Sequence, residues 1–148
     1  MRNKNMKNRY LFKAKRVGDG EWVTGSLITC EDGTCKIATS CLEGKADEPI
    51  LVCAYDVDKD TICQCTGLND KNGKLIWEND IVKRTDKPKA EEPTIGIIEY
   101  DIANTAFIIQ WLDVPNYSPT FPWKEKIEVI GNKELLEKEL QDRASRKD

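Results

Sequence analysis

Apolar and polar residues alternate with a period of two along most of the chain, and Gly or Asn turns interrupt the alternation about every eight to twelve residues. Alternation of this kind gives each strand one apolar face, so the pattern is typical of a β-rich domain. One hairpin is expected around Gly18-Asp19-Gly20 and a second around Asp32-Gly33. The expected strands are residues 10–17, 21–29, 35–39, 50–55, 60–67, 74–84, 94–101, 106–112 and 127–132.

Only the C-terminal stretch has the period of a helix. Asn132 is a good N-cap for it, because an asparagine side chain can accept a hydrogen bond from the first turn. Leu135, Leu136, Leu140 and Ala144 form a narrow apolar stripe along this helix. We expect the stripe to pack on the sheet; the second possibility is that it meets its copy in another subunit.

These elements predict a mainly β fold of the α+β type. Residues 1–62 are expected to form an antiparallel β section, and residues 63–148 a small SH3-like barrel section that ends in the C-terminal helix. The two sections are expected to share one core. A chain of 148 residues can bury a sizeable core without metal or disulfide staples.

The formal net charge of −3 is unevenly distributed. Residues 1–16 carry seven Lys or Arg and no acid, whereas residues 17–123 hold nine basic and nineteen acidic groups. An acidic body repels nucleic acid, because Lys and Arg contacts to phosphate supply most of the affinity in such complexes. The basic N-terminal arm is the exception. It reads either as a solvated tail or as a binding site for nucleic acid or another anionic partner.

The expected cellular location depends on two kinds of apolar segment that the sequence lacks. No apolar run is long enough to cross a bilayer, and the N-terminus has no apolar block of the kind found in signal peptides. A cytoplasmic protein without membrane contact is therefore expected. Stable disulfides are rare in that compartment.

The cysteines are expected to be free buried thiols, since cysteine often fills a core as a small hydrophobe. Two alternatives stay open. A two-residue Asp32-Gly33 loop would place Cys30 opposite Cys35, where the pair could be oxidised. A metal site built on Cys30, Cys35, Cys63 and Cys65 is the other alternative, although no spacing is the CxxC of structural zinc sites. The six cysteines are Cys30, Cys35, Cys41, Cys53, Cys63 and Cys65.

The chain contains no histidine, which removes the commonest general base and the commonest metal ligand. It also lacks the glycine-rich phosphate loops GxxxxGK[ST] and GxGxxG. Asp70, Glu78 and Asp80 could bind a hard cation, which keeps a carboxylate-dependent metal hydrolase as a third functional hypothesis. Asp70 and Asp80 are more simply explained as acceptors for backbone N–H groups at a turn and a corner. No catalytic residue and no cofactor are therefore expected.

The stretch TICQCTGLNDKNGKLIWENDIVKR, residues 61–84, together with the later GIIEYD, FIIQW and IEVIGN, closely resembles the YopX-like proteins of bacteriophages and prophages. The opening RYLFKAKRVGDGEWVTGSLI is similar to the start of that family, so the resemblance spans nearly the whole chain. Its most specific part runs from Gln64 to Val82. The matching positions are Gln64, Thr66, Gly67, Leu68, Asp70, Gly73, Trp77, Glu78 and Asp80.

Two positions depart from the family pattern. Cys65 stands where an aromatic residue is common, and it is expected to fill core space, which weakens the metal hypothesis. Asn79 stands where glycine is common. Asparagine tolerates positive φ better than most residues, so we expect a left-handed conformation at this corner.

The resemblance implies a small, mostly β protein of phage origin, and it supplies no catalytic residue. The leading hypothesis is a non-enzymatic accessory protein that acts in the host bacterial cytoplasm by contacting an unidentified phage or host protein. A homo-oligomer could form through an edge strand or through Leu135, Leu136 and Leu140. Nucleic-acid binding through the basic N-terminal arm is the alternative.

Overall fold

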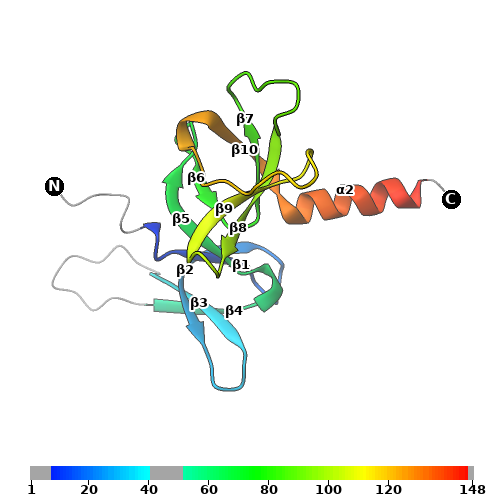
Figure 1. Ribbon diagram of the computed structural model, residues 1–148. Coiled ribbons are helices and arrows are strands. Elements are labelled where there is room, and N and C mark those ends of the chain that lie inside the picture. Colours follow the sequence, from blue (N-terminus) through cyan, green and yellow to red (C-terminus); the bar gives the residue numbers. More distant parts are fainter. Residues whose placement is uncertain (1–7, 41–51, 147–148) are drawn as a thin grey trace, which may run out of the picture. The chain divides into compact units, whose positions relative to one another are not determined.

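The computed structural model describes residues 8–40 and 52–146 (Figure 1). It consists of two antiparallel sheets and one C-terminal helix, so the predicted mainly β, α+β class is confirmed. The chain divides into two compact units, Met1–Gly67 and Leu68–Asp148. The division falls after Gly67, whereas the sequence placed the boundary after residue 62.

The first unit is an antiparallel sheet in which β1 to β4 form a meander and β5 returns to pair with β1. The hairpin expected at residues 18–20 is present, with Lys15 paired to Trp22. A bridge between Arg16 and Val57 brings the end of β1 to the end of β4. The strands are β1 (Phe12–Lys15), β2 (Trp22–Thr29), β3 (Cys35–Ser40), β4 (Val52–Val57) and, after the short 3-10 helix η1 (Lys59–Thr61), β5 (Cys63–Asn69), in the order β4-β3-β2-β1-β5.

The hairpin between β2 and β3 differs from the expected one by one residue. The backbone N–H of Cys30 donates to the carbonyl of Thr34 at 2.8 Å, so the loop holds three residues, 31–33, instead of two. Gly33 closes it at φ 85°, as in a three-residue loop that ends in a glycine bulge. The predicted pairing of Cys30 with Cys35 was therefore wrong. The two side chains lie on opposite faces of the hairpin.

The core of the first unit is built around Ala14, Ile37 and Val57. These residues come from β1, β3 and β4, which the meander brings to one face of the sheet. Gly25 in β2 allows the close approach of β3 on which this packing depends. A Cβ atom at this position would lie 2.2 Å from the backbone oxygen of Ala38, a distance that no side chain can accept.

The second unit contains an open four-stranded sheet in the order β10-β7-β8-β9. The strand β5 continues past Gly67 into this unit and leads through a turn to β6. A bulge between Val129 and Gly131 interrupts the pairing of β10 with β7. The new elements are β6 (Leu75–Trp77), β7 (Asp80–Arg84), β8 (Ile95–Asp101), β9 (Ala106–Trp111), the 3-10 helix η2 (Lys124–Lys126), β10 (Ile127–Asn132) and α2 (Lys133–Ser145).

The SH3-like barrel expected from the sequence does not close. Within residues 68–146 no ladder joins β9 to β10, because other segments occupy the outer edges of both strands. Ile109 exchanges two backbone hydrogen bonds with Thr120, at 2.6 and 3.1 Å, along the outer edge of β9. The backbone groups of Ile127 and Val129 on β10 bond to the turn that follows β5.

The core of the second unit lies on one face of this sheet. Gly96 lets the β9 side chains approach β8 closely, since a Cβ atom there would lie 2.3 Å from Cγ2 of Ile109. Tyr100 and Phe107 extend the packing through an edge-to-face contact with ring centroids 5.2 Å apart. The buried cluster comprises Ile76, Val82, Ile98, Ile109, Trp111, Ile127 and Val129.

The helix α2 begins as predicted. The side chain of Asn132 accepts a hydrogen bond from the backbone N–H of Leu135 at 3.0 Å, which confirms it as the N-cap. Figure 1 shows the helix extending away from the four-stranded sheet. Leu135 lies over Gly131 in β10, but no residue of α2 is buried. The prediction that the apolar stripe packs on the sheet was therefore wrong.

Gly25 provides a test of the β2–β3 packing. We expect Gly25→Ala to lower the free energy of unfolding by about 1–3 kcal/mol, because the new methyl group would collide with backbone and not with a flexible side chain. Gly18→Ala is the matched control, since a Cβ atom at Gly18 meets nothing within 4 Å. Urea unfolding of both variants measures the difference. Equal stability of the two would contradict the close β2–β3 packing.

Candidate functional site

The turn between β5 and β6 is organised by the carboxylate of Asp70, which is only 6% exposed. Its Oδ1 atom accepts the backbone N–H groups of Asn72 and Lys74, each at 2.9 Å. Its Oδ2 atom accepts the backbone N–H of Val129, also at 2.9 Å, from a strand 59 residues along the chain. Gly73, at φ 81°, reverses the chain direction. One side chain therefore closes the turn and attaches it to β10.

The charge of Asp70 is stabilised by these bonds. Burial by itself raises the pKa of the carboxyl group, since it removes water from the charged form. The N–H groups of Val129, Lys74 and Asn72 outweigh burial, with help from the Lys74 charge, and hold the pKa of Asp70 below its ordinary value. An acceptor saturated in this way is poorly suited to general acid–base chemistry at neutral pH.

The turn also protects the outer edge of β10. The backbone N–H of Lys71 donates to the carbonyl of Ile127 at 3.1 Å, next to the bond from Val129 to Asp70. The carbonyl of Ile127 and the N–H of Val129, which follow each other along this edge, are thus both hydrogen-bonded within the second unit. An unpaired strand edge invites pairing with another chain, so this arrangement disfavours oligomerisation through β10.

The corner between β6 and β7 uses the second buried carboxylate. Asp80 is 3% exposed, and its Oδ2 atom accepts the backbone N–H of Trp77 at 2.8 Å. Asn79 adopts φ 69°, which confirms the predicted left-handed conformation. The N–H of Asn79 donates to Ile98 in β8, and its carbonyl accepts the N–H of Lys133 at the start of α2, both at 2.8 Å. The corner therefore joins β7, β8 and the helix.

The remaining signature residues lie in or beside the same structural framework. Gln64 donates from Nε2 to the carbonyl of Arg9 at 3.4 Å. Thr66 is buried in β5, and Gly67 follows it at φ 79°. Leu68 packs against the core of the second unit. Glu78 is half-buried at the corner.

The cysteines do not assemble the predicted metal site. Cys63 and Cys65 are buried in β5 and, like the half-buried Cys30 and Cys35, form no disulfide. In residues 8–40 and 52–146 no group of three or more His, Cys, Asp or Glu side chains is placed to hold a metal ion.

Cys53 in β4 is disulfide-bonded, which corrects the expectation that all six cysteines are free thiols. The bond was not expected, because the sequence predicted a cytoplasmic location, where stable disulfides are rare. Cys41, for which the same expectation was made, lies outside the described residues.

A cluster of cationic and aromatic side chains in the first unit was not anticipated from the sequence. The Nζ atoms of Lys13 and Lys15 lie 5.0 and 5.6 Å from the centroid of the Trp22 ring. The sequence contained a signal for this cluster. Lys13 and Lys15 lie two residues apart on one strand, and the hairpin places Trp22 directly across from Lys15. Cation–π contacts of this kind favour a lysine close to an aromatic face.

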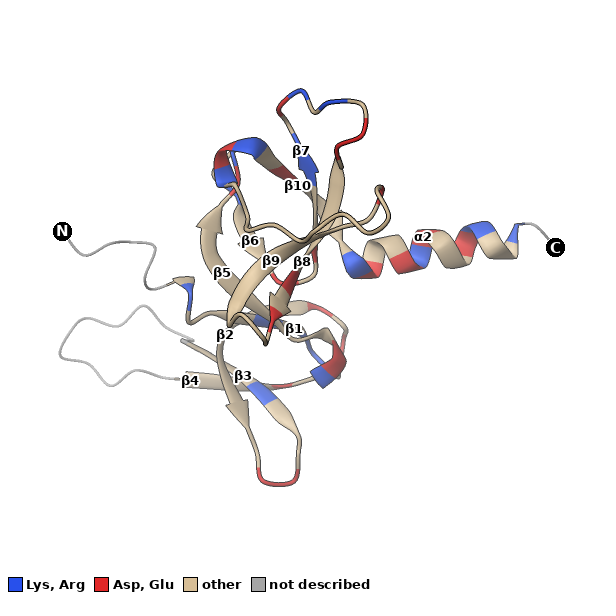
Figure 2. Ribbon diagram, in the orientation of Figure 1, with Lys and Arg blue, Asp and Glu red and all other residues tan. Residues whose placement is uncertain are grey.

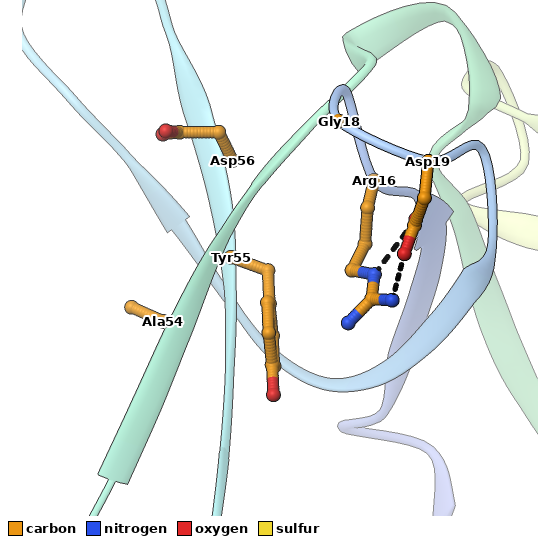
Figure 3. A pocket seen from close by; sticks show the side chains of 6 residues that line it. All are labelled: Arg16, Gly18, Asp19, Ala54, Tyr55 and Asp56. Carbon is orange, nitrogen blue, oxygen red and sulfur yellow. Dashed lines mark hydrogen bonds and ion pairs between the residues drawn. The ribbon is translucent and has the colours of Figure 1, made fainter.

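A pocket of about 390 Å³ lies beside Arg16 (Figure 3). The guanidinium lies over the ring of Tyr55, 4.9 Å from its centroid, and donates from both Nε and Nη2 to Asp19. These bonds from Arg16 hold the pKa of Asp19 below its ordinary value. Because Arg16 is already neutralised, the pocket has little capacity to bind an anion.

The bonds of Asp70 predict a large effect of removing its charge. We expect Asp70→Asn to lower the free energy of unfolding by about 2–3 kcal/mol, because the amide NH₂ group would face a backbone N–H donor. Asp101→Asn is the control, since Asp101 accepts only exposed hydrogen bonds from Ala103 and Asn104, and its effect should stay within about 0.5 kcal/mol. Equal effects in denaturant titrations would contradict a structural role specific to Asp70.

The depressed pKa of Asp70 predicts how this difference depends on pH. In the folded protein the pKa of Asp70 is lower than its value of about 3.9 in the unfolded chain. The charged carboxylate therefore stabilises the fold fully above about pH 3.9, and this stabilisation is lost as the pH falls through the pKa of the folded state. The stability gap between wild type and Asp70→Asn should thus be constant near neutrality and narrow below about pH 4. A gap of the same size at both extremes of pH would refute this assignment.

Comparisons with known proteins agree with the resemblance in the sequence. The family described as YopX protein matches residues 11–134. No curated protein is significantly similar to the chain. Among solved structures, the crystal structure of protein EF1440 from Enterococcus faecalis is similar, with 22% sequence identity and a TM-score of 0.47 over 82% of this chain and 90% of that chain. At that TM-score the likeness supports no inference.

The family match extends across both units. It begins just before β1, includes the Asp70 turn and the Asp80 corner, and ends at the first residues of α2. The predicted membership is confirmed, and the chain belongs to the YopX protein family.

Proposed function

We propose that this chain is a non-enzymatic accessory protein of phage or prophage origin that binds another protein through α2. The observation that carries the proposal is the exposure of this helix. Leu135, Leu136 and Leu140 are 54%, 36% and 56% exposed, and no residue of α2 is buried. The proposed partner is a phage or host protein in the bacterial cytoplasm, or a second copy of the chain.

A short helix such as α2 is stable only with contacts outside itself. An isolated helix of fewer than about 12–15 residues is marginal in water, and most helices in proteins gain their stability from packing of an apolar face. α2 has 13 residues, and its leucines find little to pack on in the described chain. A partner that buried Leu136 and Leu140, one turn apart, would supply the missing contacts in the manner of a helix bound in a groove.

The charges of α2 fit an apolar contact better than an electrostatic one. The helix carries three basic and four acidic residues, which are interspersed along its length (Figure 2). No strong field of one sign therefore selects the partner. Specificity would come from the shape of the apolar stripe and from the flanking charged pairs.

The edges of the four-stranded sheet are weaker candidates for an interface. Val129 and Ile127 on β10 are bonded to the Asp70 turn, and Ile109 on β9 is bonded to Thr120. The proposal of a non-enzymatic role is supported by the use of Asp70 and Asp80 as acceptors for backbone N–H groups. None of the helices in the described ranges is long and apolar enough to span a membrane.

A pair of substitutions in α2 tests the proposal. We expect Leu136→Glu/Leu140→Glu to retain the fold, since neither side chain is buried, and to lose the partner. Lys138→Gln/Gln141→Glu is the matched control, because it changes the charge by the same two units at positions outside the leucine stripe. Tagged forms of the three proteins would be captured from phage-infected host cells and the bound proteins identified by mass spectrometry.

The proposal expects a protein that is retained by the wild type and by the control but not by the leucine variant. Light scattering measures the mass of each purified protein in solution and shows whether the partner is a second copy of the chain. Thermal unfolding checks that the variants remain folded. If the leucine variant and the wild type retain the same proteins and have the same mass in solution, α2 is not the binding surface.

A further inference from the structure

The cluster around Trp22 in the first unit has a composition suited to a ligand. The ring is 39% exposed, and the ammonium groups of Lys13 and Lys15 lie 5.0 and 5.6 Å from its centroid. Lys13 and Lys15 are two residues apart on β1, so both point to the face of the sheet on which Trp22 lies. Positive charge and aromatic surface are therefore held together by a paired strand.

The same character continues toward the N-terminus. The guanidinium of Arg9 lies 5.2 Å from the centroid of the Tyr10 ring and donates to the Tyr10 hydroxyl at 3.1 Å. Tyr10 is 61% exposed. Residues 1–16 contain seven basic residues and no acidic one. Basic and aromatic side chains are thus interspersed from Arg9 to Arg16, and Trp22 lies across from Lys15.

We infer that this face of β1 and β2 binds single-stranded nucleic acid. Proteins that bind single strands combine a positive surface, which follows the phosphates, with exposed aromatic rings, on which bases stack. Lys13 and Lys15 supply the first component, and Trp22 supplies the second. A duplex hides the faces of its bases and would use only the charges.

Two acidic residues of the first unit are paired with cations outside this cluster. Asp19 is bonded to Arg16, and Asp56 forms an ion pair with Lys36. Each of these ion pairs neutralises the charge of its aspartate. Asp19 and Asp56 therefore weaken the attraction of Lys13 and Lys15 for a phosphate less than two unpaired carboxylates would. The inference concerns the first unit and is independent of the protein contact proposed for α2.

The inference can be tested by fluorescence anisotropy with a labelled oligothymidylate of about 15 nucleotides. The full chain should bind it at about 50 mM salt and lose most of its affinity at about 200 mM. Lys13→Gln/Lys15→Gln should lower the slope of log affinity against log salt by about two. Trp22→Thr should weaken binding about tenfold and leave that slope unchanged, because stacking releases no counterions.

Lys138→Gln/Arg143→Gln is the matched control, since it removes two positive charges from exposed positions on α2. It should bind like the wild type, and a duplex of the same length should bind less tightly than the single strand. Thermal unfolding verifies that each variant is folded. Absence of salt-dependent binding, equal affinity for the duplex, or equal losses in the control and in Lys13→Gln/Lys15→Gln would each overturn the inference.

Discussion

The hydrogen bond from the backbone N–H of Val129 to Asp70 is the interaction on which the second unit depends most. It joins a turn to a strand 59 residues away and does so in a buried position. A buried carboxylate is stable only if donors replace the water that it loses, and in this turn three backbone N–H groups do so. The turn after β5 is thereby fixed to β10, which in turn pairs with β7.

The Asp80 corner extends this arrangement to the rest of the sheet. Asp80 holds the backbone of Trp77 where β6 gives way to β7, and Asn79 bonds to both β8 and the start of α2. Asp70, Asp80 and the backbone of Asn79 thus together position β10, β7, β8 and the helix. In this YopX family member, Asp70 and Asp80 of the signature thus serve the fold, as acceptors for backbone N–H groups. The binding surfaces proposed above lie outside the signature, on α2 and on β1 and β2.

The sequence predicted the features that are determined locally. Asn132 as N-cap, Asn79 in the left-handed region and the hairpin at residues 18–20 follow from the preferences of single residues, and each is confirmed. The loop at residues 31–33 was missed because Asp-Gly suits both a two-residue and a three-residue loop. Only the register of the paired strands decides between them, and it separates Cys30 from Cys35.

Features that depend on distant contacts could not be predicted. The bond between Asp70 and Val129 leaves no local pattern, and the closure of a barrel depends on which segments reach the outer edges of β9 and β10. An apolar stripe such as that of α2 shows which face of a helix is apolar, but not what that face contacts. The hairpin at residues 18–20 was predicted, but only the register of its two strands shows that Lys13 and Lys15 contact Trp22.

Amide hydrogen exchange of Val129 tests the role of Asp70 most directly. The outer side of β10 faces no other strand at this position, and its N–H donates to Asp70 instead. If the carboxylate is the structural centre of the unit, this amide should exchange only through global unfolding, as slowly as the amides in the centre of β7 and β8. Exchange as fast as that of an exposed loop amide would show that the bond opens freely, and it would contradict the central structural role of Asp70.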